Sequence, residues 1–447
     1  MIDLFLNKIS AVDSNKTALI YNNNSTSYGQ LLNRIDELYE IISSSFEEKK
    51  AVVISGDYSL DSIALIFALC KHKCIFIPIV SANKKEIEKK IEVSDPDIII
   101  DANSLSIDFF RKNHDTTNDY FKDLYAKNSS GLVLFSSGST GTPKAMVHDF
   151  DNLLGTYLEG KFKNLTFLVF LLFDHIGGLN TILNVLSMGS TLVIPVKRTP
   201  EDVALLIQKF NINILPASPT FLNLMNIGGI FENYDLSSLK LITYGTEPMA
   251  ESLLRNLNLK LPKTRLIQTF GTSETGIIKT KSKSSTSLLV KFDDPNQEVK
   301  IVEGELWIKS KNRVLGYINH EDSFSNDEWF KTGDLVEEKD NGYYKIIGRK
   351  SKVINVGGEK VLPIEVETII LQLPYIIDCT VYSKDNPITG QVVAVRVVVS
   401  NNDLEIKQLK KDIKKHCKQN LDRFKVPAEI IINDKILYSS RFKKSLN

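Results

Sequence analysis

The chain has 447 residues, too many for one typical core, and its 43% hydrophobic and 24% charged residues are typical of a folded globular protein of two or three domains. The 55 Lys and Arg residues nearly balance the 54 Asp and Glu residues, so the net charge of +1 provides no strong field that would favour nucleic acid or an anionic membrane. The N-terminus lacks a basic segment followed by a long apolar run, and the longest apolar stretch (165–173) is about half of a membrane span, so we expect a cytoplasmic protein without an integral membrane segment.

Short apolar runs alternate with amphipathic stretches over the first 260 residues or so. The runs predict buried strands at 51–55, 74–80, 97–100, 131–135, 165–173, 191–195 and 240–244. Helical patterns between several of them cover 61–73, 200–210 and 248–257. This alternation predicts parallel sheets covered by helices, with ligands bound where loops leave the strand ends. We therefore predict an α/β fold in which residues 1–348 form a large domain of doubly wound sheets.

The pattern changes near Gly348. A strand pair, a helix opening at Pro363, further strands and a helix over 405–421 are predicted to follow. That last helix places four apolar residues on one face, Ile406, Leu409, Ile413 and Cys417, and six lysines largely elsewhere, Lys407, Lys410, Lys411, Lys414, Lys415 and Lys418. Residues 349–447 are thus predicted to form a small α+β domain.

Cys70, His72 and Cys74 form a local cluster of residue types that can bind a metal ion. No second ligand pair with zinc-finger spacing accompanies it. We therefore interpret the cluster as the end of a buried helix that runs into a strand.

A loop rich in glycine and hydroxyl side chains follows the predicted strand 131–135. Gly138 and Gly141 allow a tight turn and a close approach to a ligand. Hydroxyl donors come from Ser136, Ser137, Ser139, Thr140 and Thr142, and Lys144 adds a positive charge. The loop suits a polyphosphate, but it is not a Walker loop, because no Gly-Lys-Ser/Thr follows the glycines. By itself it is also compatible with a polar surface loop.

This loop resembles the phosphate-binding signature of the adenylate-forming superfamily, and further segments match that superfamily in chain order. They are Ser27–Leu31, Lys71–Pro78, Phe173–Gly178, Thr269–Glu274, Gly304–Trp307 with Gly316-Tyr317, Lys331–Asp334 with Gly348-Arg349, Asn355–Lys360, and Lys425–Pro427. The chain is identified on these residues as similar to acyl-CoA and aryl-CoA synthetases, peptide-synthetase adenylation domains and luciferases. The matches cover most of its length.

The resemblance implies a nucleotide site. The loop Ser136–Lys144 would hold the β and γ phosphates of ATP, and Glu274 would hold Mg²⁺. Tyr244, Gly245, Thr246, Phe270 and Gly271 would lie beside adenine. Asp334 would accept the ribose hydroxyls, and Arg349 would add a ribose or phosphate contact. Ser273 stands where the family usually has Thr, and its hydroxyl can still donate to a phosphate.

The resemblance also implies a mobile C-terminal domain that swings between two half-reactions. Lys443 is our prediction for the catalytic lysine, although Phe442 replaces the usual glycine, and Lys444 is the alternative. Ser351 occupies the position of the usual hinge Asp or Lys, so the hinge residue is less well defined. After the swing, Gly357 and Gly358 would let the pantetheine arm pass the backbone.

The identity of the carboxylic acid is not readable from the residues. His175 matches the pocket histidine of acyl- and aryl-CoA ligases, whereas Asp174 lies near the aspartate that amino-acid-activating members use for the α-ammonium. The run 175–178 favours the acyl-ligase alignment, with Ala217, Ser218 and Pro219 lining the same pocket.

The activity implied is ATP-dependent formation of an acyl-adenylate with release of pyrophosphate, followed by transfer of the acyl group to the thiol of coenzyme A. The 355–360 loop favours coenzyme A, and the alternative acceptor is the phosphopantetheine of an acyl carrier protein, for which the lysine-rich helix could be a docking face. A nucleotide-binding regulator without catalysis is a third hypothesis. Glu274, Asp334 and Lys443 argue against it.

Overall fold

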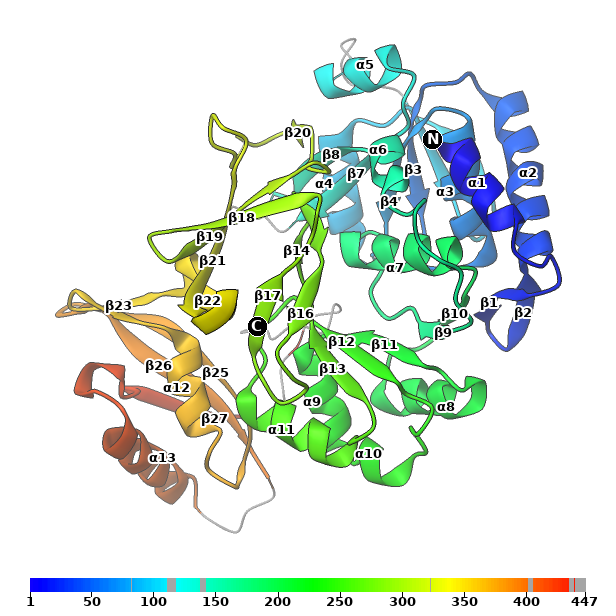
Figure 1. Cartoon of the computed structure of the whole chain (residues 1–447). Coiled ribbons are helices and arrows are strands. Elements are labelled where there is room, and N and C mark those ends of the chain that lie inside the picture. The colour runs from blue at the N-terminus through cyan, green and yellow to red at the C-terminus, as the bar shows by residue number, and fades with distance from the viewer. Residues whose placement is uncertain are drawn as a thin grey trace.

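The structure is a computed structural model that describes residues 1–81, 83–110, 118–136, 142–321, 323–400, 405–433 and 438. Figure 1 shows a large part built from two sheets with helices around them, a third sheet beside these, and a smaller C-terminal part. Within the described ranges, every helix is too short or too polar to span a lipid bilayer.

The first sheet has seven strands and is parallel except at one edge, where β2 runs antiparallel to β1. Its order is β13 (Arg265–Gln268), β12 (Leu241–Tyr244), β11 (Ile214–Ala217), β9 (Thr166–Leu168), β10 (Thr191–Ile194), β1 (Thr17–Tyr21) and β2 (Asn24–Ser27). The strands predicted at 191–195 and 240–244 are confirmed. The prediction at 165–173 is wrong beyond residue 168, where β9 ends: Val169 keeps one hydrogen bond to Val193 of β10, and the carbonyls of Phe170 and Leu171 accept from side chains instead.

The second sheet also has seven strands, with a parallel centre and antiparallel edges. Its order is β20 (Gly316–Tyr317), β8 (Lys144–Asp149), β7 (Gly131–Ser136), β4 (Ile75–Ile79), β3 (Ala51–Ser55), β5 (Ile98–Asp101) and β6 (Ile107–Phe109). The four parallel strands coincide with the predictions at 51–55, 74–80, 97–100 and 131–135. The nearly continuous burial of β3, β4 and β7 is what a sheet covered on both faces requires, whereas β5, nearer the edge, alternates between buried and partly buried residues.

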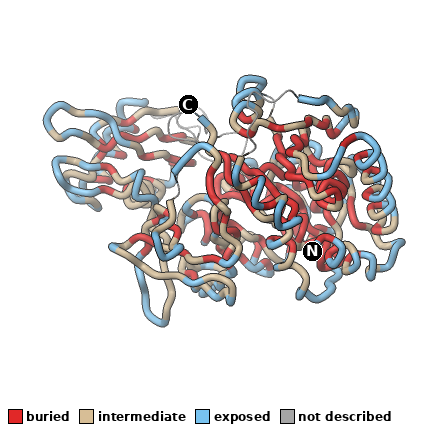
Figure 2. Tube along the Cα trace, turned by 90° about the horizontal axis from the view of Figure 1, so that it is seen from above, coloured by how far each residue is buried: buried red, intermediate tan, exposed pale blue. Residues whose placement is uncertain are grey.

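Helices cover these two sheets, and one of them lies between the sheets (Figure 1). They are α1 (Ile2–Ser10), α2 (Tyr28–Ser45), α3 (Leu60–Lys71), α4 (Lys84–Ser94), α5 (Asp119–Ala126), α6 (Phe150–Gly155), α7 (Ile176–Ser187), α8 (Pro200–Phe210), α9 (Pro219–Ile227), α10 (Ile230–Asn233) and α11 (Glu251–Lys260). Leu179 of α7 shares one apolar core with Val52 of β3 and Leu192 of β10, so α7 joins the two sheets. Figure 2 shows the buried segments gathered in this interior.

A third sheet was not predicted. It is antiparallel, in the order β16 (Thr280–Ser282), β17 (Leu289–Phe292), β22 (Tyr343–Arg349), β21 (Phe330–Lys339), β19 (Glu305–Ser310) and β18 (Gln297–Val302). A hairpin of β14 (Phe270–Thr272) and β15 (Gly276–Ile278) precedes it. Its core is small, with three buried apolar residues, Leu306, Ile308 and Val336, which leaves little apolar pattern to detect in the sequence.

The C-terminal part is the predicted α+β unit. Its sheet contains β23 (Ile354–Val356), β24 (Glu359–Val361), β25 (Ile376–Asn386), β26 (Gly390–Val399) and β27 (Glu429–Asn433), packed with α12 (Pro363–Ile370) and α13 (Ile406–Asn420). Leu409, Ile413 and Cys417 are buried as predicted. Ile406 is not: it opens the helix one turn ahead of Leu409 and is 60% exposed, so the apolar stripe begins at Leu409.

Candidate active site

A cavity of about 530 Å³ lies where the carboxyl ends of the first sheet, the third sheet and the C-terminal part meet. That volume is in the range of small-molecule sites. Six residues predicted for nucleotide binding line it: Gly245, Thr246, Phe270, Gly271, Asp334 and Arg349. They come from segments up to about a hundred residues apart. The fold therefore brings together a set that the sequence could only group by resemblance.

The strand ends of β12 and β13 form one wall of the cavity. Gly245 directly follows β12, and a Cβ at this position would lie 2.7 Å from the carbonyl oxygen of Thr269, so no other residue fits without displacing backbone. Thr246 has φ of 70°, an unusual value for a residue with a branched side chain. Tyr244 does not line the cavity. Its ring is buried, and its hydroxyl has no hydrogen-bond partner among the residues that the structure describes.

Phe270 and Gly271 begin the hairpin that borders the cavity. Phe270 contributes its ring to the cavity wall and also packs edge-on against Phe292, with 5.7 Å between ring centroids. Gly271 is confined by its neighbour strand, because a Cβ there would lie 2.8 Å from the carbonyl oxygen of Gly276. Phe270 and Gly271 therefore pack against neighbouring strands and also border the space where a ligand could bind.

Ser273 and Glu274 lie in the turn of the same hairpin and are partly buried, but they do not line the cavity. Thr272 and Thr275 close the turn through their hydroxyl groups, 2.9 Å apart. The hydroxyl of Tyr317 on β20 donates to Oε1 of Glu274 at 2.8 Å. One oxygen of Glu274 is therefore held, and its direction is fixed by a strand of the second sheet.

Asp334 on β21 and Arg349 at the end of β22 are cross-strand partners. Nε of Arg349 donates to Oδ1 at 2.9 Å, and Nη2 donates to Oδ2 at 3.4 Å. Burial raises the pKa of Asp334 above its usual value, and the charges of Glu274 and Glu305 act in the same direction, while Arg349 opposes them. A carboxylate with about four lone-pair sites can accept this arginine and still accept hydroxyl groups from a ligand.

Glu305 on β19 lies behind the site, and no role was predicted for it from its place in the Gly304–Trp307 motif. Its Oε1 accepts from the backbone N–H of Gly333 at 3.0 Å, and its Oε2 accepts from Nζ of Lys350 at 3.2 Å. Gly333 has φ of 72° and precedes Asp334. Glu305 thus fixes the turn that presents Asp334, and the signal that could have found it was its place in the Gly304–Trp307 segment.

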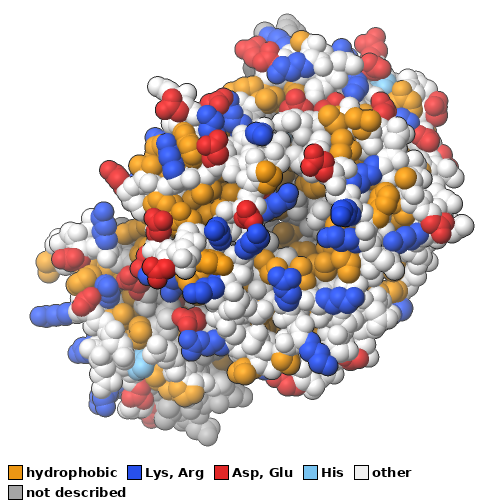
Figure 3. Space-filling view, in the orientation of Figure 1, with side chains coloured by type: hydrophobic (Ala, Val, Ile, Leu, Met, Phe, Trp, Pro, Cys, Tyr) orange, Lys and Arg blue, Asp and Glu red, His pale blue; other side chains and the backbone are white. Residues whose placement is uncertain are grey.

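The central part of the predicted phosphate loop, Ser137, Gly138, Ser139, Thr140 and Gly141, lies outside the described residues. Its two ends are described: Ser136 closes β7 and pairs with Lys144, which opens β8, while Thr142 is exposed. Asn319 bridges the base of the loop, because it donates to the carbonyl of Pro143 at 2.8 Å and accepts from the N–H of Ala145 at 3.0 Å. Figure 3 shows Lys and Arg side chains around a hollow near the middle of this face, an arrangement that suits a polyanion.

His175 and Asp174 have different surroundings although they are adjacent. His175 caps α7, and its Nδ1 accepts from the N–H of Gly177 at 3.1 Å, which leaves the proton on Nε2 in the neutral ring. Asp174 is 2% exposed, and its Oδ2 lies 3.4 Å from Nζ of Lys90, whose side chain is 3% exposed. Asp174 is therefore part of a buried ion pair between the 173–178 segment and α4, where Lys90 also pairs with Glu86 at 2.8 Å.

Gly357 and Gly358 form the two-residue turn between β23 and β24, with φ of 62° and 97°. Two successive positive φ values explain both glycines structurally. They do not line the cavity in this conformation. Lys443 and Lys444 lie outside the described residues.

The Cys70–Cys74 segment is the predicted helix-to-strand junction: α3 ends at Lys71, His72 caps it, and β4 begins at Ile75. Cys70 and Cys74 are buried free thiols, and burial raises the pKa of Cys74 to about 12. In the described part of the chain, no group of three or more His, Cys, Asp or Glu residues is arranged to hold a metal ion by itself.

Comparison with known proteins identifies the family of this chain. Residues 7–318 match the family model "AMP-binding enzyme", and residues 365–443 match "AMP-binding enzyme C-terminal domain". A 2-succinylbenzoate–CoA ligase of Staphylococcus epidermidis is 26% identical over 99% of this chain and 96% of its own length. A 4-coumarate–CoA ligase-like protein of Arabidopsis thaliana is 27% identical over 62% of this chain and 55% of its own length.

Solved structures share the fold over nearly the whole chain. The anthranilate CoA ligase AuaEII in complex with anthranoyl-AMP has a TM-score of 0.83 at 19% identity, covering 99% of this chain and 95% of that one. The o-succinylbenzoate CoA synthetase of Bacillus subtilis in complex with its acyl-adenylate has a TM-score of 0.76 at 19% identity, covering 98% and 96%. Because a family model spans well over half of its length, the chain belongs to the AMP-binding enzyme family, within the adenylate-forming superfamily of acyl- and aryl-CoA synthetases.

Proposed function

We propose that this enzyme activates an aromatic carboxylic acid with ATP and transfers the acyl group to coenzyme A. The observation that carries the proposal is the cavity that gathers Gly245, Phe270, Asp334 and Arg349 around one space. Several relatives and neighbours are named as ligases of aromatic acids: 2-succinylbenzoate, anthranilate and, by likeness, 4-coumarate. Their names support an aromatic substrate class and make 2-succinylbenzoate the first acid to test.

In the first half-reaction, a carboxylate oxygen attacks the α-phosphorus of ATP, and the bond to pyrophosphate breaks. Such a transfer depends mainly on positioning and on stabilising charge. Asp334 would accept the ribose hydroxyls with the lone pairs that Arg349 does not use. The Ser136–Lys144 loop would contact the β and γ phosphates, with its base fixed by Asn319. Lys443 would stabilise the charge that develops between the carboxylate and the phosphate.

Glu274 fits a Mg²⁺ ligand by the chemistry of its donors. Tyr317 occupies one lone pair of Oε1, which leaves Oε2 and fixes the carboxylate direction. Mg²⁺ is usually held by one or two carboxylates together with phosphate oxygens and water, so a single protein carboxylate is sufficient. The ion would neutralise charge on the phosphates, and Ser273 would add a hydroxyl donor beside them.

The surroundings of Asp174 support an acid without an α-ammonium group. Its carboxylate already has a cationic partner, because Oδ2 pairs with buried Lys90 at 3.4 Å, although Lys90 also pairs with Glu86 at 2.8 Å. A substrate ammonium would therefore meet a carboxylate whose charge is already compensated, which favours an acid without that group. His175, in contrast, caps α7 with a ring proton on Nε2 and could donate to the substrate or to the developing adenylate.

The direct test is ATP–pyrophosphate exchange with Mg²⁺ over a panel of acids, beginning with 2-succinylbenzoate, 4-coumarate and anthranilate and including aliphatic and amino acids. We expect exchange with an aromatic acid and AMP release when coenzyme A is added. Exchange only with an amino acid would overturn the substrate class. Binding of ATP without exchange or AMP on the whole panel would overturn catalysis and support the regulator hypothesis.

A carrier protein is the second candidate acceptor, and α13 is the observation that favours it. Its six lysines are exposed, and none makes an ion pair with another residue in the described ranges: Lys407, Lys410, Lys411, Lys414, Lys415 and Lys418. A basic face of this kind suits an acidic partner. We compare acyl-CoA and acyl-carrier formation at matched concentration and at two ionic strengths. The carrier protein would replace coenzyme A as the proposed acceptor if it is loaded while no acyl-CoA is detected. Charge reversal at Lys407, Lys411, Lys414 and Lys418 should then block the loading.

A further inference from the structure

The segment that leads from β9 to His175 is largely buried but belongs to no strand. The N–H of Val169 still donates to the carbonyl of Val193 on β10 at 2.9 Å, and beyond it Phe170, Phe173 and Asp174 are at most 2% exposed, while Leu171 and Leu172 are partly buried. Backbone carbonyl groups in such a segment must find partners elsewhere, because an unpaired buried carbonyl is costly. The partners here are side chains from two other loops.

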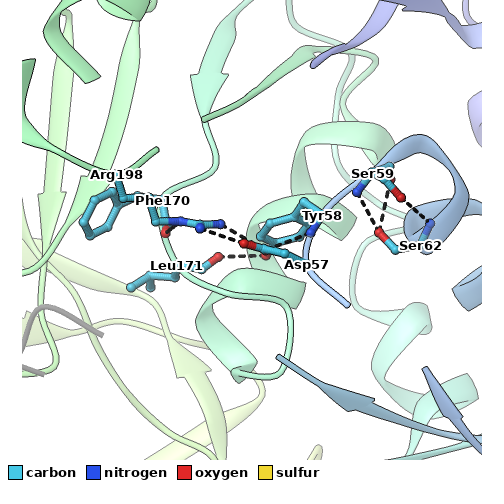
Figure 4. Close-up of polar contacts among 7 residues, drawn as sticks. All are labelled: Asp57, Tyr58, Ser59, Ser62, Phe170, Leu171 and Arg198. Atoms are coloured by element: carbon cyan, nitrogen blue, oxygen red, sulfur yellow. Dashed lines mark hydrogen bonds and ion pairs between the residues drawn. The ribbon is translucent and has the colours of Figure 1, made fainter. Parts of the chain in front are cut away.

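Arg198, in the loop between β10 and α8, supplies the first partner (Figure 4). Its Nε donates to the carbonyl oxygen of Phe170 at 3.1 Å. Its two terminal nitrogens donate to the two oxygens of Asp57, at 2.8 and 3.1 Å. Asp57 follows β3 of the second sheet, whereas Arg198 follows β10 of the first sheet. The arginine thus ties the irregular segment to loops of both sheets.

Tyr58, the neighbour of Asp57, supplies the second partner. Its hydroxyl donates to the carbonyl oxygen of Leu171 at 2.7 Å, and its ring packs on Phe173 with 5.4 Å between centroids. Burial raises the pKa of Tyr58 well above its usual value, so the hydroxyl stays protonated and remains a donor. Figure 4 shows Tyr58 and Arg198 reaching the segment at consecutive residues.

The same segment sets the start of α7 and therefore the position of His175. The backbone N–H of His175 donates to the carbonyl of Leu172 at 3.2 Å. A Cβ at Gly178 would lie 2.0 Å from that carbonyl oxygen and 2.5 Å from the hydroxyl oxygen of Tyr58. The first turn of the helix and the held segment are in close contact, with His175 between them, so a shift of one displaces the other.

We propose that Asp57, Tyr58 and Arg198 are positioning residues for the acid substrate: they hold the 170–172 segment and thereby place His175 at the acyl pocket. This inference rests on the proposed function. None of the three belongs to a segment that the resemblance singled out. The ion pair contributes little to global stability, because Asp57 is 42% exposed and such pairs are screened by water. Its removal therefore acts mainly on the local geometry.

The kinetic test uses Tyr58→Phe and Arg198→Lys in the full chain. Loss of a partly buried hydrogen bond corresponds to about twofold to tenfold in an equilibrium constant, so we expect KM for the acid to rise by up to about tenfold while KM for ATP changes less than about twofold. Lysine keeps the positive charge but cannot reproduce the three hydrogen bonds of the arginine, so Arg198→Lys should also raise KM for the acid. Tyr28→Phe is the matched control, since the hydroxyl of buried Tyr28 donates to the carbonyl of Ser190, also at 2.7 Å.

A second measurement does not depend on activity. Hydrogen–deuterium exchange of the 169–177 region should be faster in Tyr58→Phe and Arg198→Lys than in the wild type and in Tyr28→Phe. If no acid supports ATP–pyrophosphate exchange in the wild type, the proposed function fails. Hydrogen–deuterium exchange then still decides whether the three side chains hold the segment. Unchanged hydrogen–deuterium exchange in 169–177 would overturn the positioning role. So would kinetics in which Tyr58→Phe and Tyr28→Phe raise the KM for the acid and the KM for ATP equally.

Discussion

The pair of Asp334 and Arg349 leads to an asymmetric prediction. The side chain of Asp334 is 10% exposed, whereas that of Arg349 is 59% exposed. When Asp334 is replaced by Asn, the arginine recovers hydration, and the repulsion from Glu274 and Glu305 is relieved. When Arg349 is replaced by Ala, a buried carboxylate loses its cation. The two halves of one ion pair should therefore have unequal effects on stability.

The magnitudes follow from the exposure of each partner. We expect Asp334→Asn to change the free energy of unfolding by about 1 kcal/mol or less, as for a solvent-exposed pair. Arg349→Ala should lower it by about 1–3 kcal/mol, the cost of an unsatisfied buried group. Ligand binding should show the reverse order: losing charge-assisted hydrogen bonds to ribose raises KM for ATP about tenfold to hundredfold in Asp334→Asn, with kcat less changed.

The assays are urea denaturation and steady-state kinetics on both variants. Equal losses of stability would refute the exposure argument, and an unchanged KM for ATP in Asp334→Asn would remove that residue from the nucleotide site. A pH series tests the direction in which Asp334 affects stability. Because the folded-state pKa of Asp334 is raised, its contribution to stability falls as pH rises from its usual pKa of 3.8 through the raised value, while the ionised form that binds ribose increases. Arg349→Ala should move this loss of stability to higher pH, because it removes the charge that lowers the pKa of Asp334.

Three further predictions concern other residues. Lys443→Ala should lower the adenylation rate about 10²- to 10³-fold but spare thioester formation from supplied acyl-adenylate, measured by the two half-reactions; an active Lys443→Ala beside an inactive Lys444→Ala would shift the register by one. Glu274→Gln should raise the Mg²⁺ concentration for half-maximal exchange about tenfold without unfolding the chain, because an amide oxygen still accepts from Tyr317; an unchanged Mg²⁺ requirement would contradict the assignment. Burial lowers the pKa of His148 to about 4, so this residue should lower the free energy of unfolding by about 3 kcal/mol between pH 6.5 and 4; His148→Phe should lose less stability than the wild type over that range by about this amount, and an equal loss in both proteins would contradict the assignment.

The sequence predicted the elements and residues whose signal is local. The strands at 51–55 and 131–135 are continuous apolar runs, and α8 is bounded as predicted because Thr199 caps it and Pro200 opens it. The residues predicted for nucleotide binding could be proposed from the sequence because each lies within a short segment with glycines or acids at fixed offsets. That six of them line one cavity could be seen only in the fold.

Contacts between distant residues have no comparable signal. Arg198 meets Asp57 across 141 positions of the chain, and Tyr58 meets the carbonyl of Leu171 across 113. A hydrogen bond to a backbone carbonyl places no demand on the residue that owns the carbonyl, so Leu171, which accepts from Tyr58, and Phe170, which accepts from Arg198, carry no sign of these contacts in the sequence. The antiparallel sheet around Leu306 was missed for a related reason, since its half-buried strands carry weak apolar alternation.

Asp174 and His175 show how one residue of register changes the inferred substrate. In the sequence the two stand side by side, and each matches a different branch of the family. In the structure, the carboxylate of Asp174 is already paired with Lys90, and Lys90 also lies 5.7 Å from the ring of Phe135, next to the phosphate loop. A single buried ammonium therefore lies between Asp174, Glu86 and the end of β7. The ammonium of an amino-acid substrate would meet a carboxylate that Lys90 already compensates, whereas a plain carboxylic acid leaves this pair undisturbed, and that difference favours the proposed acid without an α-ammonium group.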